Sequence, residues 1–98
     1  MNTDEIRSVL RGVIDPELGV NIVDLGLVYD IAVDDNTIDV AMTMTTPSCP
    51  LGEYLTEAVE RAISLSFPRT EVKVELVWQP AWHPGMITDD GRKALGMA

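Results

Sequence analysis

The residue whose side chain is best suited to reactive chemistry is Cys49, the only cysteine of the chain. It lies in the run from Thr45 to Leu51 (TTPSCPL), between a predicted strand and a predicted helix. Pro50 suits the first helical position, because its missing N–H would have no partner there. Cys49 then lies at or beside the N-cap, where free N–H groups and the helix dipole stabilise an anion. We expect a thiol pKa below the free value of about 8.5, which favours nucleophilic attack and soft-metal binding.

The alternative for this thiol is a buried cysteine that acts as a small hydrophobe, and the residues alone leave both interpretations open. Asp15 and Glu17 flank a rigid proline, and such a pair can ligate a metal or accept backbone N–H bonds. The second role is the commoner one for an isolated Asp-Pro-Glu, and Asp24 is likewise predicted to cap a loop. His83 is more often a surface or packing residue than a metal ligand at such a position.

The elements that must position these residues follow from periodicity. Apolar residues at helical spacing predict helices, strict alternation predicts strands, and a short polar turn between two alternating runs predicts a hairpin. Thr3 is the expected N-cap of the first helix and Thr88 that of the last. The predicted elements are a helix over 3–13, strands over 27–33 and 38–44, a helix over 51–66, a strand over 72–78, and a short helix up to Leu95.

This α-β-β-α-β-α order predicts an α+β fold of two layers, with the helices packed on one face of a small three-stranded mixed sheet. The third strand follows a helix, so we expect it to run parallel to a hairpin strand through a right-handed crossover. Residues 1–98 are expected to form a single domain. Met42, Met44 and Met86 are predicted to fill the core, and Trp78 and Trp82 to close it or to form an apolar rim.

Composition excludes several function classes. The chain has 7 Lys and Arg against 16 Asp and Glu, a net charge of -9, which argues against binding nucleic acid or an anionic membrane. No apolar run is long enough to span a bilayer, and the N-terminus lacks the basic start and apolar stretch of a signal peptide. A single cysteine excludes an internal disulfide and a metal site built from several thiolates of one chain. A small, acidic, cytoplasmic domain is expected.

Four motifs carry a family resemblance. They are 15–18 (DPEL), 22–28 (IVDLGLV), 45–51 (TTPSCPL) and 77–82 (VWQPAW). In this order they resemble the small iron–sulfur cluster assembly domain of SufT-like and PaaD-like proteins, a domain related to that of eukaryotic cytosolic iron–sulfur assembly factors. Each motif alone is weak, but together they span nearly the whole chain and are fairly specific.

The resemblance implies the same α+β fold and an accessory role in maturing iron–sulfur proteins, without enzymatic activity. Cys49 matches the reactive cysteine of the family, and Asp15, Glu17 and Thr46 match other positions of its pattern. In the family, this tail usually has an acid and, two positions later, a second proline. This chain has Gln79 in place of the acid and Ala81 in place of that proline. The absence of a cysteine-rich tail favours the short SufT-like type over the longer phenylacetate-pathway type.

Several functions remain open from the sequence. Cys49 could bind iron or a transient cluster across a homodimer, share it with a client apoprotein, or dock clients and other assembly factors without holding metal. A thiol enzyme with His83 as base is a second class, although no third residue is found to orient such a dyad, and 98 residues leave little room for a deep pocket. A third class is a metal-free adaptor that uses Trp78 and Trp82 as its interaction edge. A PaaD-like accessory protein of an aromatic-degradation oxygenase is a further alternative.

Overall fold

The computed structural model describes residues 2–45 and 51–96. In chain order the elements are α1 (Thr3–Leu10), β1 (Val28–Val33), β2 (Thr37–Met42), α2 (Leu51–Ser66), β3 (Glu71–Leu76), the 3₁₀ turn η1 (Pro84–Met86) and α3 (Asp89–Ala94). The predicted α+β class and the α-β-β-α-β-α order are confirmed. None of the described helices combines the length and apolarity that a membrane span requires.

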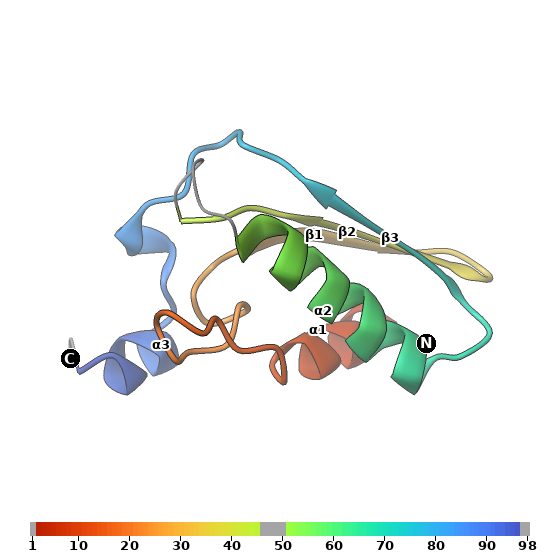
Figure 1. The fold of residues 1–98 in the computed structure, drawn as a ribbon, viewed down its shortest axis with the longest axis horizontal. Helices are drawn as coiled ribbons and strands as arrows, with labels where there is room; N and C mark the ends of the chain where they lie inside the picture. The colour runs from red at the N-terminus through yellow and green to blue at the C-terminus, as the bar shows by residue number, and fades with distance from the viewer. Residues whose placement is uncertain (1, 46–50, 97–98) are drawn as a thin grey trace.

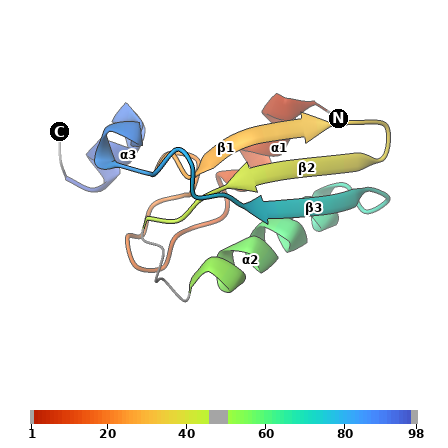
Figure 2. The same ribbon diagram turned by 90° about the horizontal axis from the view of Figure 1, so that it is seen from above.

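The sheet has the order β1-β2-β3, with β2 in the centre. β1 and β2 form the predicted antiparallel hairpin, whereas β2 and β3 run parallel, with Ile38 opposite Val72 and Met42 opposite Leu76. Figure 2 shows the parallel pair ending at the same edge of the sheet, near the start of α2. The sheet is therefore mixed, as expected.

Two helices cover one face of this sheet. Figure 1 shows the strands edge-on above α2 and α1. On α2, Leu55, Val59 and Ile63 recur every four residues and are fully buried, as are Ile6 and Leu10 on α1. Burial of these apolar side chains supplies the main driving force for the two-layer arrangement.

Two helix ends differ from the prediction. Asn2, not Thr3, is the N-cap of α1, because its side-chain oxygen accepts a hydrogen bond from the N–H of Glu5 at 2.9 Å. The helix ends at Leu10 rather than at Val13, and Arg11 is its C-cap. The prediction of Thr3 is therefore wrong by one position, because asparagine serves as an N-cap as well as threonine does.

Two strands are shorter than predicted at their C-terminal ends. β2 ends at Met42, but Met44 is still only 2% exposed. Met42, Thr43 and Met44 are all buried, so burial continues past the end of the strand, and the apolar alternation of the sequence does not show where the strand stops. The methionines behave as predicted, since Met42 and Met44 lie in the core and Met86 is partly buried.

The last helix, α3, is capped by Thr88 as predicted, through a 3.1 Å bond from the N–H of Gly91. It packs against the loop before β1 rather than against the sheet. A Cβ atom at Gly91 would lie 2.7 Å from the carbonyl oxygen of Asp24. Gly91 thus lowers helix propensity by roughly 1 kcal/mol, but it permits this close contact.

Candidate functional site

The candidate site is the edge of the sheet where β2 and β3 end and α2 begins. Beyond β2, the N–H of Thr43 donates to the carbonyl of Leu27 at 2.8 Å, and Val77, just after β3, donates to the carbonyl of Met42 at 2.8 Å. The first bond joins the chain that leaves β2 to the segment that enters β1, and the second joins the chain that leaves β3 to the end of β2. The carboxyl ends of parallel strands are a common place for functional sites in sheets with crossover helices.

The first turn of α2 packs directly on this edge. A Cβ atom at Gly52 would lie 3.2 Å from Leu76 Cδ1 and 4.0 Å from Met44 Cγ. The absence of a side chain at Gly52 therefore lets the helix start close to the ends of both strands. Its first N–H groups and the positive end of its dipole therefore lie at this end of the sheet.

Cys49 and Thr46, two of the predicted site residues, lie outside the described residues. The structure therefore does not test the predicted N-cap position of the thiol. It describes the residues on either side, from Thr43 to Thr45 after β2 and from Leu51 onward in α2. Cys49 stays two positions before the first residue of α2 in the sequence.

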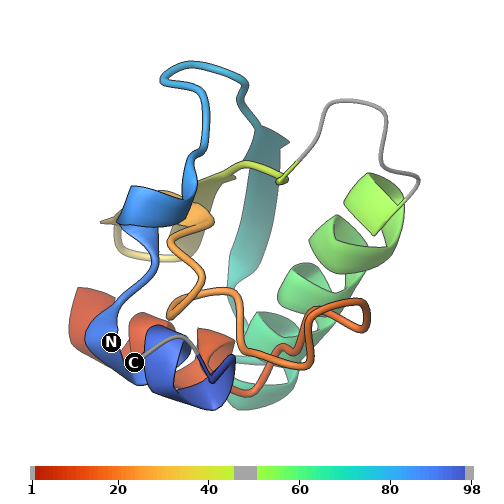
Figure 3. The same ribbon diagram turned by 90° about the vertical axis from the view of Figure 1, so that its left-hand side faces the viewer.

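The segment 77–88, here called the strap, covers the same end of the sheet. Figure 3 shows it arching over the loop that precedes β1. The indole Nε1 of Trp82 donates to the carbonyl of Leu25 at 2.7 Å, and the hydroxyl of Tyr29 donates to the carbonyl of Pro80 at 2.7 Å. Both bonds join residues more than 50 positions apart.

The far end of the strap is held by Asp24. Its Oδ1 accepts a 3.0 Å bond from the Thr88 hydroxyl, and its carbonyl accepts a 2.8 Å bond from the Thr88 N–H. The other carboxylate oxygen accepts from the Asn21 side chain at 2.7 Å. Asp24 is therefore a structural acid that caps the loop, as predicted, and it also fixes the C-terminal segment.

A small hollow lies between the strap and the end of β2. It has a volume of about 90 Å³, and its lining residues are Thr43, Met44, Thr45, Trp78, Ala81 and Trp82. Small-molecule sites typically measure about 300 to 1,000 Å³, so this hollow could hold little more than one side chain or a few waters. Trp78 is 42% exposed beside it, whereas Trp82 packs against the core.

Asp15 lies in a separate turn before the loop. It is 2% exposed, and its Oδ1 accepts bonds from the N–H groups of Glu17 at 2.8 Å and Leu18 at 3.2 Å. These bonds fit the loop-holding role, while Glu17 itself is exposed. Within 2–45 and 51–96, no three His, Cys, Asp or Glu side chains come together in a way that could hold a metal ion.

His83 has a local role. Its Nδ1 accepts a 3.1 Å bond from the N–H of Gly85 and caps the 3₁₀ turn η1. The imidazole is exposed, and this nitrogen is engaged by the backbone. Whether His83 reaches Cys49 lies outside the described residues.

Sequence reasoning missed Tyr29 and Gly52. The register of β1 shifts between Val28 and Asp30, and the bulge leaves Tyr29 without a partner on β2. A bulge re-aims a side chain, and the Tyr29 hydroxyl contacts both Pro80 and Met86 Sδ, the latter at 3.6 Å. No local pattern signals either residue, because both act through contacts distant in sequence.

Comparisons with known proteins add to this geometry. Residues 3–76 match the family model described as iron-sulfur cluster assembly protein. The chain is 37% identical over 95 residues to the Fe-S protein maturation auxiliary factor YitW of Bacillus subtilis, covering 96% of this chain and 93% of the relative. It is 39% identical to the Fe-S protein maturation auxiliary factor SufT of Staphylococcus aureus, covering 88% and 99%.

A solved structure, a domain of unknown function from Bacillus anthracis, shares the fold with a TM-score of 0.91 at 38% identity, covering 97% of this chain and 92% of that one. One subunit of a putative 1,2-phenylacetyl-CoA epoxidase of Escherichia coli is 34% identical over 93% of this chain, but the match covers only 55% of that protein. Both branches named by the resemblance are thus found among the relatives.

Proposed function

The chain belongs to the iron–sulfur cluster assembly protein family, and from this premise we propose that it is an accessory factor for the assembly of iron–sulfur clusters or their transfer to client apoproteins. The proposed role is that of a maturation factor, not of an enzyme. Relatives of nearly the same length carry the name auxiliary factor, which favours the short SufT-like type over a component of an aromatic-degradation oxygenase. We place this role in the cytoplasm, where thiols stay reduced.

The observation that carries the proposal is the position of the only cysteine. In the sequence, Cys49 lies two positions before α2, whose first turn packs through Gly52 against the ends of β2 and β3. The N-terminus of a 16-residue helix favours a thiolate over a thiol. A thiolate is the protein ligand that iron and iron–sulfur clusters prefer.

We propose that Cys49 completes its coordination with ligands from the client. One thiolate per chain cannot supply the four that a cluster usually takes. The hollow at this edge is about 90 Å³, which favours transfer at the surface over binding of a small-molecule substrate. Iron or a cluster is therefore a transient cargo, with Asp15, Glu17 and Thr46 in supporting roles.

The test is replacement of Cys49 by alanine in cells that lack the wild-type chain. We expect the activity of client iron–sulfur enzymes to fall to the level of cells without the factor, at unchanged abundance of the variant and of the client apoproteins. Glu53→Ala, an exposed substitution in the first turn of α2, is the control and should leave maturation unchanged. Full client activity with the alanine variant would refute the role of the thiol.

Anaerobic reconstitution with iron and sulfide then distinguishes a factor that carries iron or a cluster from one that only binds client proteins. If Cys49 holds cargo, the wild type should gain iron, sulfide and visible absorption that the alanine variant lacks. A colourless wild type that still supports maturation in cells would favour docking without metal.

A second candidate function is a metal-free adaptor, and the exposure of Trp78 favours it. At 42% exposed beside the hollow, this indole is available to a partner. Trp82, the other candidate, is a poorer probe, because its Nε1 bond to Leu25 makes it part of the fold. Client capture that survives Cys49→Ser and is lost in Trp78→Ala would support the adaptor.

A further inference from the structure

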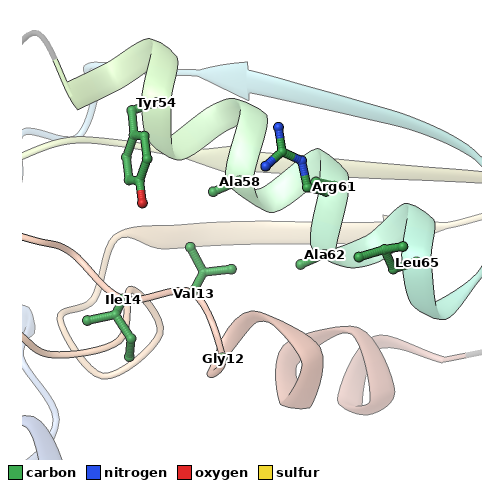
Figure 4. Close-up of a pocket in the computed structure, with 8 residues that line it drawn as sticks. All are labelled: Gly12, Val13, Ile14, Tyr54, Ala58, Arg61, Ala62 and Leu65. Atoms are coloured by element: carbon green, nitrogen blue, oxygen red, sulfur yellow. The ribbon is translucent and has the colours of Figure 1, made fainter.

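An apolar groove of about 370 Å³ lies along α2 and extends from Tyr54 to Leu65. Figure 4 shows α2 on one side and the segment after α1 on the other. The lining residues are Gly12, Val13, Ile14, Tyr54, Ala58, Arg61, Ala62 and Leu65. Of the five large apolar side chains that are exposed in the described part of the chain, three line this groove. Such a concentration marks an interaction surface rather than scattered surface residues.

The groove residues of α2 form one stripe. Tyr54, Ala58, Ala62 and Leu65 follow one another at intervals of four, four and three, so they share a side of the helix. The large side chains lie at the two ends and the alanines in the middle. Figure 4 shows Tyr54 beside Ile14 at one end and Leu65 at the other. Small residues in the centre let another helix approach closely.

This stripe is complementary to itself. In a twofold interface each contact occurs twice, so residue i meets residue j and j meets i. When two α2 helices pack antiparallel about the midpoint between Tyr54 and Leu65, Leu65 of each copy enters the space beside Tyr54 of the other. The same register brings Ala58 of one copy to within one residue, about 1.5 Å along the axis, of facing Ala62 of the other.

The charged residues beside the groove are also complementary under this twofold symmetry. Arg61 lines the groove, and Glu57, one helical turn earlier, is exposed on the same flank. In the antiparallel register the guanidinium of Arg61 meets the carboxylate of the partner's Glu57, and two such pairs form. We propose that this groove is an interface between two copies of the chain, with the α2 helices packed antiparallel. The inference goes beyond the proposed function and does not depend on Cys49.

The arrangement has a consequence for the candidate sites. With a rise of about 1.5 Å per residue, the first residues of the two α2 helices lie roughly 25 Å apart. Each is preceded in sequence by its own Cys49. Such a dimer presents two separate sites at opposite ends, and the two thiols of one dimer cannot share a cluster.

The test is sedimentation velocity at physiological ionic strength, where a Debye length of about 8 Å screens the repulsion between two chains of charge -9. The wild type should approach the mass of two chains as the concentration rises. Arg61→Glu and Glu57→Arg each place like charges together twice, so each variant should dimerise about tenfold more weakly or worse.

Mixing the two variants gives the decisive measurement. In a heterodimer of Arg61→Glu with Glu57→Arg, both cross-chain pairs are of opposite charge again, so the mixture should associate as the wild type does. A change confined to one helix cannot produce this rescue. Circular dichroism checks that both variants fold. A wild type that remains monomeric, a dimer that Arg61→Glu leaves intact, or a mixture no more associated than its components would each overturn the proposal.

Discussion

The helix-covered sheet and the strap are held in the structure by different kinds of contact. Between the helices and the sheet, apolar side chains at regular intervals fill a shared core, as Leu55, Val59 and Ile63 of α2 do. In the strap, hydrogen bonds between residues distant in sequence add to the apolar contacts of Trp82 and Ile87. The indole of Trp82 donates to the carbonyl of Leu25, 57 positions earlier.

The difference matters because the candidate site lies where the two regions meet. Thr43 and Thr45 extend from the sheet, whereas Trp78 and Trp82 come from the strap. A core distributes its stabilisation over many contacts, but a strap held by a few bonds can open locally at a lower free energy. We therefore expect strap variants to change the site while the core stays folded.

The largest effect should come from the core. Leu55→Ala removes a fully buried side chain between α2 and the sheet, so the free energy of unfolding should fall by about 2 to 5 kcal/mol. Glu60→Ala on the same helix is the control, because Glu60 is exposed and does not line the groove, and it should change stability by less than about 0.5 kcal/mol. Urea unfolding followed by circular dichroism measures both. Equal losses would mean that burial on α2 does not organise the fold.

The region with periodic contacts is also the region that could be predicted. The spacing of Leu55, Val59 and Ile63 identifies their helix and its buried face, and alternation identifies the strands to within two residues. Periodicity reports which face is buried, because burial repeats with the geometry of the element. It does not report where the ladder of hydrogen bonds stops, so β2 was predicted to run on to Met44.

The strap could not be predicted in this way. Tyr29 and Asp24 hold it through partners 51 and 64 positions away, and no local pattern encodes such pairs. At the candidate site, Cys49 and Thr46 remain predictions, because they lie outside the described residues. The loop role of Asp15 was foreseeable, since aspartate before a turn often accepts nearby backbone N–H groups.

An intermediate effect is expected where the two regions touch. Gly26 has φ +77°, and a Cβ atom there would collide with the Met86 backbone of the strap. Gly26→Ala should therefore cost about 2 to 4 kcal/mol, from the left-handed conformation and the collision together. Gly19→Ala is the matched control, because Gly19 has φ +70° and nothing within 4 Å of its Cβ position. It should cost only about 1 to 2 kcal/mol in the same unfolding assay. Equal costs would show that the strap does not press on this loop.

The smallest effect, and the sharpest test of the contrast, concerns Trp82. Trp82→Phe keeps an aromatic ring but removes the Nε1 donor that satisfies the Leu25 carbonyl, so we expect a loss of about 1 to 2 kcal/mol. Amide hydrogen exchange should quicken in the strap while the exchange of β2 and α2 follows only the small global change. Trp78→Phe is the control, since Trp78 is 42% exposed, and it should alter neither quantity. If Trp82→Phe instead destabilises the chain as much as Leu55→Ala, and exchange quickens uniformly, the strap is part of the cooperative core. The candidate site then cannot move independently of the sheet.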